Sequence, residues 1–377
     1  MHFFNSTKTL SRYLQSHRQL ATMATTTSTQ TQKALLLTKV GAPLVLTTDR
    51  AIPTPGPKQV QLRVAIAGLN PHDQKARDYG LFIANNLPAV LTNDVVGTIT
   101  SLGSDLPEGL GLGDRIIAQS GMPGDWTQNG LQEYTVADVG AFSKIPDEIT
   151  DDEAATLPTN IIAPLIGLFV TLGIPPPWDS SSAGKEFDHA GTTVLIIGGG
   201  SNCGKFAVQL AKLAGIGKIV VVGGDEKELK EMGATHLVDR HGGHDVVLGR
   251  IRDIVGDELV YAFDAVNPPD GQILAIDALS NTKRGVLARL LPNAKVDESK
   301  VKEGKTAGFE VKDVFGLSQI HAAVAVPFWE LLPEYLKTGK IKPLDYTVIK
   351  GLDADAVNAV LDGYRDGKKV IKTHVHI

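Results

Sequence analysis

The 377-residue chain has one cysteine, Cys203, little net charge and no long apolar run. One cysteine cannot form a disulfide within the chain or build a cysteine-rich zinc site, and it is typical of a reducing compartment. A formal net charge of −5 gives no reason to expect nucleic acid. The most apolar stretch, residues 161–170, is too short for a membrane helix. The length suits two globular domains, and we expect a monomer or homodimer without nucleic-acid or membrane partners.

Residues 192–222 carry the strongest local pattern. Thr192–Ile197 is a short run rich in β-branched residues, as expected of a buried strand. Small residues follow at 198–204, and 205–215 place apolar side chains on one helical face. Residues 216–222 form a second apolar run. The stretch therefore predicts one βαβ unit with a parallel crossover.

The turn inside this unit suggests a dinucleotide. Residues 199–204, Gly-Gly-Ser-Asn-Cys-Gly, match the G-x-G-x-x-G fingerprint except that Ser201 replaces the middle glycine. A helix start presents unpaired amides and partial positive charge, which suit a pyrophosphate. The alternative is a tight strand-to-helix turn without a ligand.

The rest of the chain predicts an α/β fold. Short strands separated by Gly/Pro turns predict a β-rich first domain: 35–37, 44–46, 60–66, 95–100, 115–118 and 131–136. Strands alternating with helices then predict a doubly wound parallel sheet: strands 236–239, 259–264, 272–277 and 309–315, with helices 226–232 and 246–255. A helix at 328–339 precedes strand-like segments 347–349 and 370–377, which rejoin the first domain. The expected domains are 33–160 with 325–377, and 161–324.

Residues 1–32 lie outside this pattern. They contain Lys8, Arg12 and Arg18 with many Ser and Thr, and the first acidic residue is Asp49. That composition is typical of a mitochondrial transit peptide, which would place the protein in the matrix. We expect instead a disordered tail ahead of an internal start at Met23 and a cytoplasmic protein, with the mitochondrial matrix as the close alternative.

Several motifs together resemble the medium-chain dehydrogenase/reductase superfamily. Residues 113–116 are similar to its G-D-R-V turn, 130–134 to its G-x-x-x-E-Y strand, 145–155 to its interdomain helix start and 229–235 to the stretch before its third strand. The resemblance covers about residues 33–377. It implies a GroES-like, β-barrel-type catalytic domain and an inserted Rossmann domain.

The zinc ligands of that superfamily are missing here. The first ligand cysteine is replaced by Asn70, and the His–Glu pair by Asn93 and Asp94. Neutral asparagine is a poor zinc ligand, so we expect no metal. His72 alone is more typical of a structural or loop residue than of a ligand. The run with Asn70, Pro71, Asp73 and Lys75 resembles the zinc-independent branch, namely quinone oxidoreductases and fungal trans-enoyl reductases.

This resemblance implies hydride transfer from a nicotinamide to an activated C=C bond or a quinone in an interdomain crevice. The protein must then position both partners and supply donors near the carbonyl oxygen. Lys75, near Asn70, is a candidate donor or cofactor contact, or else a solvated lysine. Tyr134 is a candidate proton donor, or a packing residue. The candidate catalytic residues are Lys75, Asn70 and Tyr134.

The end of the second strand bears on cofactor choice. An acid there binds the ribose of NAD, but Val222 is followed by Gly223 and Gly224, which leave room for a 2′-phosphate. Lys227 and Arg240 could pair with that phosphate. NADPH is therefore expected, although Asp225 keeps NADH open. The candidate cofactor-binding residues are Asn70, Asp73, Gly199, Gly200, Ser201, Asn202, Cys203, Gly204, Gly223, Gly224, Asp225, Lys227, Arg240 and Val266.

The leading hypothesis is an NADPH-dependent, metal-free reductase of enones, enoyl compounds or quinones, with a small-molecule substrate. The alternative is an NADP(H)-binding protein with little turnover that acts as a redox-responsive or interaction protein.

Overall fold

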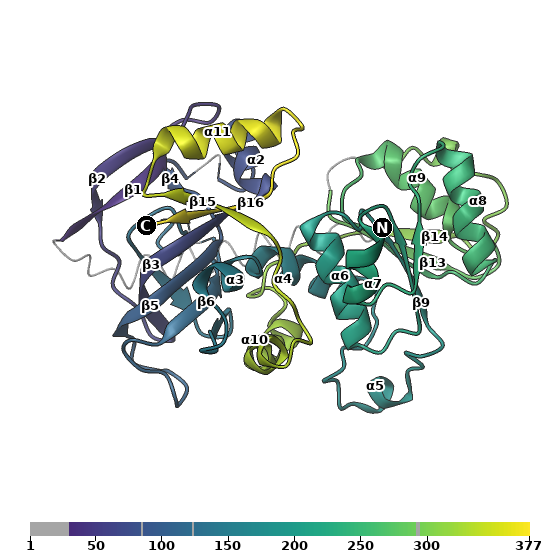
Figure 1. The fold of residues 1–377 in the computed structure, drawn as a ribbon, viewed down its shortest axis with the longest axis horizontal. Helices are drawn as coiled ribbons and strands as arrows, with labels where there is room; N and C mark the ends of the chain where they lie inside the picture. The colour runs from purple at the N-terminus through teal and green to yellow at the C-terminus, as the bar shows by residue number, and fades with distance from the viewer. Residues whose placement is uncertain (1–29, 84–85, 123, 292–294) are drawn as a thin grey trace. The chain divides into compact units, whose positions relative to one another are not determined.

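The structure is a computed structural model that describes residues 30–83, 86–122, 124–291 and 295–377. The chain divides into two compact units (Figure 1). Unit 1 comprises the described residues up to Thr159 with Ser318–Gly339 and Pro343–Ile377. Unit 2 comprises Asn160–Leu317 with Lys340–Lys342. The chain returns to unit 1 at Ser318, seven residues before the position expected from the sequence.

The expected tail or transit peptide, residues 1–32, falls mainly outside the described residues. Its last two residues are a correction, because strand β1 begins at Thr31 and Gln32 is buried. The Gln32 side chain donates to the carbonyl oxygen of Ala51 at 3.3 Å. A buried glutamine with such a partner is part of the fold. Because it is polar, it breaks the apolar/polar alternation by which a strand is recognised in a sequence.

Unit 1 is built on two sheets. A three-stranded sheet has the order β2-β1-β4, and a seven-stranded sheet has the order β15-β16-β3-β5-β6-β8 with β7 also paired to β3. The strands are β1 (Thr31–Leu37), β2 (Val45–Ala51), β3 (Gln59–Leu69), β4 (Ala89–Val90), β5 (Asp94–Leu102), β6 (Arg115–Gln119), β7 (Tyr134–Asp138), β8 (Phe142–Lys144), β15 (Tyr346–Lys350) and β16 (Lys372–His376). The helices are α2 (Pro71–Tyr79), α3 (Asp151–Ala155), α10 (Ala322–Lys337) and α11 (Ala354–Arg365).

The pattern of β3 explains how the large sheet is covered on both sides. Val60, Leu62 and Val64 alternate into one core cluster with Val95 and Ile99 of β5. Ala67 and Leu69, further along the same strand, join a second cluster with residues of β1 and α11. The end of β3 is therefore buried from more than one direction, and the residue that follows it, Asn70, is buried as well.

Unit 2 has one parallel sheet of order β11-β10-β9-β12-β13-β14. Its strands are β9 (Thr193–Ile197), β10 (Lys218–Val222), β11 (His236–Val238), β12 (Tyr261–Asp264), β13 (Gly285–Arg289) and β14 (Phe309–Asp313). The helices between strands are α6 (Asn202–Leu213), α7 (Glu226–Met232), α8 (His244–Val255) and α9 (Pro269–Ala278). Ahead of β9 the chain forms α4 (Pro158–Ile166), the π-helix η1 (Gly167–Thr171) and α5 (Ser182–Glu186), and a short 3-10 helix η2 (Glu298–Lys300) precedes β14. This arrangement confirms the α/β fold with a doubly wound parallel sheet.

One predicted strand is wrong. Residues 272–277 belong to helix α9, and the fifth strand is β13, thirteen residues further along. Four apolar residues in a row, 273–276, fit a buried strand or a buried helix equally well. Pro269 in the first turn and the acidic Asp270 beside it favour the start of a helix, which is the element observed.

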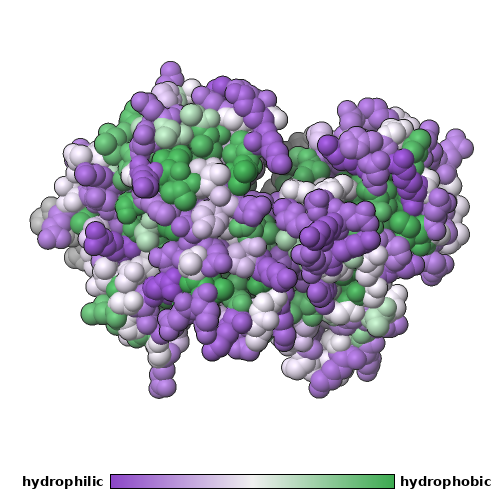
Figure 2. Space-filling model, in the orientation of Figure 1, coloured by the Kyte–Doolittle hydropathy of each residue, from purple (hydrophilic) through white to green (hydrophobic). Residues whose placement is uncertain are grey.

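The surface of unit 1 exposes apolar residues on its edge strands. Val45 and Leu46 of β2, and Tyr346 and Val348 of β15, are among the exposed large hydrophobic residues. In Figure 2 hydrophobic residues gather over the part of unit 1 where β1, β2 and α11 lie in Figure 1. Within the described ranges, the helices are all too short or too polar to cross a membrane.

Candidate active site

The turn between β9 and α6 in unit 2 is held by its own serine. Ser201 is the N-cap of α6, and its hydroxyl accepts from the Gly204 amide at 3.0 Å and donates to the Gly198 carbonyl at 2.8 Å. Ser201 therefore closes the turn with its side chain at the position where the fingerprint has its middle glycine. The amides of the first helical turn have no acceptor within the helix, which makes this end suited to an anion.

Glycines around this turn allow backbone to pack directly on backbone. A Cβ at Gly204 would lie 2.2 Å from the Gly198 carbonyl oxygen, and one at Gly199 would lie 2.3 Å from Val221 of β10. A Cβ at Gly224 would lie 2.8 Å from the Gly200 amide nitrogen. The turn after β9 and the turn after β10 are thus pressed together, which only residues without a side chain permit.

The other cofactor candidates lie at the same carboxyl edge of the parallel sheet. Gly223 and Gly224 follow β10 with positive φ, and Asp225 accepts from the Glu228 amide at 2.8 Å as the N-cap of α7. Arg240 follows β11 and its side chain lies over Gly223, where a Cβ would come within 3.2 Å of Arg240 Cδ. Lys227 is exposed in the first turn of α7.

The two cations at this edge are unneutralised. Within the described ranges, neither Lys227 nor Arg240 forms an ion pair or a side-chain hydrogen bond, whereas Lys230 pairs with Glu226 at 2.6 Å and Lys205 pairs with Glu228. Positive charge beside paired glycines leaves both space and a counter-charge for an anionic group at this edge.

Val266 completes this edge on the other side of the turn. It follows β12, and its side chain covers Gly198, where a Cβ would lie 2.6 Å from Val266 Cγ2. The loop is held by the buried carboxylate of Asp264, which accepts from the amides of Val266 at 3.0 Å and Asn267 at 2.9 Å. Burial raises the pKa of Asp264, and these hydrogen bonds act in the opposite direction.

In unit 1, the residues predicted around Asn70 form the start of helix α2. Asn70 is the N-cap, and its backbone amide donates to Asp73 Oδ2 at 2.7 Å. The other carboxylate oxygen of Asp73 accepts from the Thr92 amide at 3.0 Å. Asp73 is 1% exposed, so in this structure its two oxygens hold two segments of backbone together.

A sealed ionic network surrounds the Asn70 side chain. Its Nδ2 donates to Asp94 Oδ2 at 2.8 Å, and its Oδ1 accepts from Lys372 Nζ at 3.0 Å. Lys372 Nζ also donates to Asp94 Oδ2, and Asp94 Oδ1 accepts from the Thr159 amide at 2.8 Å. Burial by itself raises the pKa of Asp94, but the Lys372 ammonium and these hydrogen bonds hold it below its usual range. A Cβ at Gly68 would lie 2.9 Å from Lys372 Nζ, so Gly68 leaves the space for the ammonium.

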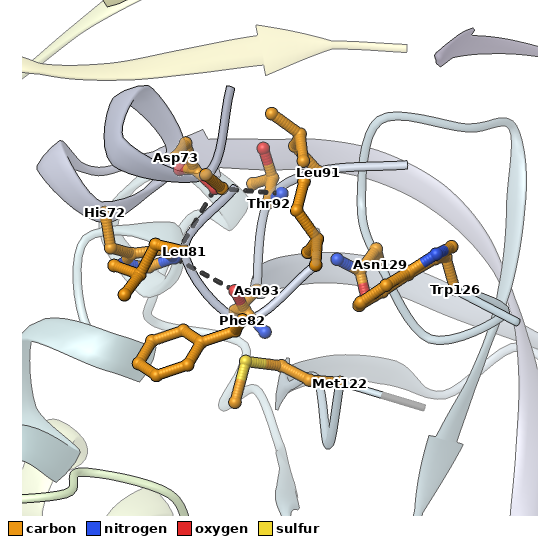
Figure 3. Close-up of a pocket in the computed structure, with 12 residues that line it drawn as sticks. His72, Asp73, Leu81, Phe82, Leu91, Thr92, Asn93, Met122, Trp126 and Asn129 are labelled. Carbon is orange, nitrogen blue, oxygen red and sulfur yellow. Dashed lines mark hydrogen bonds and ion pairs between the residues drawn. The ribbon is translucent and has the colours of Figure 1, made fainter. Parts of the chain in front are cut away.

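Beside this network lies a small, partly open hollow within unit 1 (Figure 3). Its wall combines seven apolar and five polar residues: His72, Asp73, Ala76, Leu81, Phe82, Ile83, Leu91, Thr92, Asn93, Met122, Trp126 and Asn129. In Figure 3, His72 and Phe82 lie on one side and Trp126 and Asn129 on the other. Apolar walls with a few placed polar groups are typical of small-molecule sites.

The backbone around this hollow is strained. Four lining residues other than glycine have positive φ: Phe82 at 66°, Thr92 at 81°, Met122 at 54° and Trp126 at 58°. Each such residue costs about 1 kcal/mol or more, and strain of this kind concentrates at functional sites. Trp126 is fixed in the wall by its indole N–H, which donates to the Asn86 carbonyl at 2.6 Å. The hollow is therefore our candidate for the acceptor site.

Two predicted catalytic residues, Lys75 and Tyr134, do not line the hollow within the described ranges. Lys75 is half-buried on α2, and burial lowers its pKa. Tyr134 is half-buried in β7 opposite Arg63, and its amide donates to Gln32 Oε1 at 2.5 Å. Their chemical roles stay predictions.

Sequence reasoning missed Lys372 and the walls of the hollow. One feature of the sequence could have indicated Lys372, a lone lysine in the strand-like run 370–377. If it is buried, a lysine in a strand needs a carboxylate partner, and an aspartate at the start of another strand could supply it. The positive φ of Phe82, Met122 and Trp126 has no counterpart in the residue types, which ordinarily avoid that region.

The donor atoms at the positions of the family's zinc ligands do not fit a zinc site. Asn70 Oδ1 accepts from Lys372, Asn93 Oδ1 contacts His72 Nε2 at 2.9 Å, and both oxygens of Asp94 accept hydrogen bonds. The described part of the chain contains no group of three or more His, Cys, Asp or Glu arranged to hold a metal. We derive no metal-dependent step from this site.

Comparison with protein families matches both units. Residues 56–147 match the alcohol dehydrogenase GroES-like domain, and residues 203–302 match the zinc-binding dehydrogenase domain. The trans-enoyl reductase tazE of Aspergillus terreus is 34% identical over 267 residues, which cover 68% of this chain and 84% of that protein.

Solved structures share the fold at low identity. The quinone oxidoreductase of Pseudomonas syringae pv. Tomato DC3000 aligns with a TM-score of 0.72 and 21% identity, covering 92% of this chain and 100% of that one. Mycobacterial Rv1454c complexed with NADPH aligns with a TM-score of 0.68 and 20% identity, covering 92% of this chain and 100% of that one. The sequence matches and the shared fold together establish that this chain belongs to the medium-chain dehydrogenase/reductase superfamily of oxidoreductases, with a GroES-like domain and a Rossmann domain.

Proposed function

We propose that this protein is an NADPH-dependent oxidoreductase that works without a metal and reduces an activated C=C bond, as in an enone or enoyl thioester, or a quinone. The observation that carries the proposal is the pair of glycine turns after β9 and β10, pressed together beside the unneutralised Lys227 and Arg240. The names of two similar proteins, a trans-enoyl reductase and a quinone oxidoreductase, support the acceptor class. The NADPH complex of a third supports the cofactor.

The residues of unit 2 would hold NADPH by its phosphates. The first-turn amides of α6 would receive the pyrophosphate, and Arg240 and Lys227 would receive the 2′-phosphate. When bound, the reduced nicotinamide supplies a hydride. Asp225 already caps α7 with Oδ1, which leaves it less suited to bind the ribose hydroxyl pair that NADH presents.

The residues of unit 1 would hold the acceptor. The hollow presents apolar side chains to an acceptor, with His72 and Asn93 among its polar groups. A conjugated acceptor needs no Lewis acid, because charge that develops on hydride addition spreads into an enolate that hydrogen-bond donors stabilise. The unfavourable donor set for zinc is consistent with such chemistry.

The direct test is NADPH oxidation by the purified protein with cyclohexenone, benzoquinone and crotonyl coenzyme A, followed by loss of nicotinamide absorbance. We expect turnover with at least one acceptor, unchanged by a chelator and slower with NADH. Tight NADPH binding with no oxidation across the panel would instead favour a binding protein with little turnover.

A single substitution tests the preference for NADPH over NADH. Arg240→Ala should weaken NADPH binding about tenfold and leave NADH binding unchanged, because only the 2′-phosphate loses its partner. Lys230→Ala is the matched control, since Lys230 already pairs with Glu226. Equal losses for both nucleotides in Arg240→Ala would contradict the assignment.

A further inference from the structure

Among the described residues that line the unit 1 hollow, His72 is the only histidine. It occupies the second position of α2, and its side chain is 25% exposed, so it reaches both the hollow and solvent. The neighbouring polar groups Asp73, Thr92 and Asn93 are buried. His72 can therefore exchange a proton with water while it faces the hollow.

The hydrogen bonds around His72 determine which nitrogen is available. Nε2 lies 2.9 Å from Asn93 Oδ1, and the Asn93 amide is oriented by its Nδ2, which donates to the Ser120 carbonyl at 3.4 Å. An amide oxygen only accepts, so Nε2 donates and keeps its hydrogen. Nδ1 is then the nitrogen that gains and loses a proton.

The charged and titratable groups near His72 come from its own helix and from neighbouring elements of unit 1. On its own helix, Asp73 Oδ1 lies 3.4 Å from Nε2. Burial raises the pKa of Asp73, and the nearby His72 opposes that rise. Asp94 of β5 and Lys372 of β16 form a closed ion pair and largely cancel, and Tyr364 of α11 stays neutral because burial raises its pKa. Asp73 is therefore the carboxylate that an imidazolium at position 72 would face.

We propose that His72 is a catalytic residue that donates the proton completing reduction of a conjugated carbonyl acceptor, an inference that rests on the function proposed above. Hydride adds to the β-carbon, and the π electrons of the C=C bond move to form an enolate with its charge on the carbonyl oxygen. The α-carbon then takes the Nδ1 proton of the imidazolium, the enolate C=O re-forms, and neutral His72 regains a proton from solvent. The acceptor gains one hydride and one proton in total.

This role predicts a difference between acceptors. An enolate must be protonated on carbon, which is slow without a positioned acid, whereas a reduced quinone is protonated on oxygen, which water does rapidly. General-acid catalysis typically contributes about 10²- to 10⁴-fold. His72→Gln keeps an N–H that can donate to Asn93 Oδ1 but removes the imidazolium that would donate the proton. We expect kcat with cyclohexenone to fall about 100-fold and kcat with benzoquinone to change less than about threefold.

Two further measurements separate catalysis from structure. In the natural protein kcat with cyclohexenone should fall as pH rises and the imidazolium loses its proton, and His72→Gln should lack this limb. Without cofactor, adding cyclohexanone, the saturated product, should shift the NMR resonance of the His72 ring. The matched control is His376→Gln, which changes a histidine of the same unit that pairs with Asp152 at 2.9 Å. This variant should leave kcat with both acceptors, and its dependence on pH, unchanged.

The outcomes keep the two proposals distinct. No turnover by the natural protein with any acceptor would reject the proposed function. Turnover with cyclohexenone that His72→Gln retains, or an equal loss with both acceptors, would reject the role of His72 alone. A ring resonance that cyclohexanone does not move would also count against it.

Discussion

The polar centre of unit 2 consists of backbone amides brought together by glycines, whereas that of unit 1 consists of ionised side chains sealed from water. Gly199, Gly204 and Gly224 allow close backbone packing because they have no side chain. An added methyl group at any of them should therefore disrupt the turns, even though it carries no charge. Asp94 and Lys372 are stabilised by their opposite charges, so removing one should leave the other buried without a counter-charge. One centre is thus sensitive to volume and the other to charge and pH.

The largest effect should come from breaking the buried pair. Lys372→Met leaves Asp94 ionised and buried without its partner, which should lower the free energy of unfolding of unit 1 by about 3–5 kcal/mol. Denaturant unfolding followed by tryptophan fluorescence measures it, since Trp126 and Trp329 belong to unit 1. Lys368→Met, at an exposed lysine, should cost less than about 0.5 kcal/mol.

A second substitution decides whether charge is the cause. Asp94→Asn added to Lys372→Met should recover part of the loss, because no unpaired charge then stays buried. A double variant that is less stable than Lys372→Met would mean that packing, rather than the ion pair, holds this centre.

The next effect is a dependence on pH confined to unit 1. His374 of β16 is fully buried, stacks on Tyr346 and contacts Asp152 through Nδ1. Burial lowers the pKa of His374 to about 4, from a usual value of 6.5, with the nearby Lys372 acting in the same direction. Between these values the unfolded histidine binds a proton that the folded one does not, so stability falls as pH falls.

We expect the free energy of unfolding to be about 2 kcal/mol lower at about pH 5 than at about pH 7 from this group. His374→Phe keeps a stacking ring and removes the titration, so the difference between the two pH values should shrink by that amount. Asp152 does not contribute in this window, because its hydrogen bonds to the two histidines hold its pKa below its usual range against the effect of burial. An unchanged pH dependence in the variant would show that His374 is not the group responsible.

The smallest effect tests the glycine turn. Gly204→Ala places a methyl group 2.2 Å from the Gly198 carbonyl oxygen, so the turn must shift and NADPH should bind about tenfold more weakly, about 1.4 kcal/mol. Fluorescence titration with NADPH measures this. Gly249→Ala in α8 is the matched control, because nothing lies within 4 Å of its added carbon. It should leave binding unaltered and, by helix propensity, raise stability by up to about 1 kcal/mol.

The same contrast explains how far the sequence could lead. The site of unit 2 is local: Gly199 to Gly204 span the turn after one strand and the first residues of the helix, and Gly223 to Asp225 directly follow the next strand. A pattern of that kind can be read directly, and the parallel fold follows from the alternation of elements. The one strand placed wrongly, 272–277, lay where four apolar residues in a row fit either element.

The site of unit 1 is not local. Asn70 meets Asp94 and Lys372, partners that are 24 and 302 residues away. The sequence identified Asn70 as important through its motif, but long-range pairing cannot be read from a motif. The left-handed backbone at Phe82 and Trp126 is imposed by tertiary packing against the preference of those residue types, so no single-residue rule anticipates it.

The late position of Lys372 has a consequence for biosynthesis. Ribosomes release the chain from its N-terminal side, so the residues of unit 2 up to Leu317 emerge before β16 does. The inserted unit can therefore begin to fold while the first part of unit 1 still waits for the strand that neutralises Asp94. Until residue 372 arrives, Asp94 must stay hydrated or bind a proton, so unit 1 can complete its fold only after the last strand has emerged.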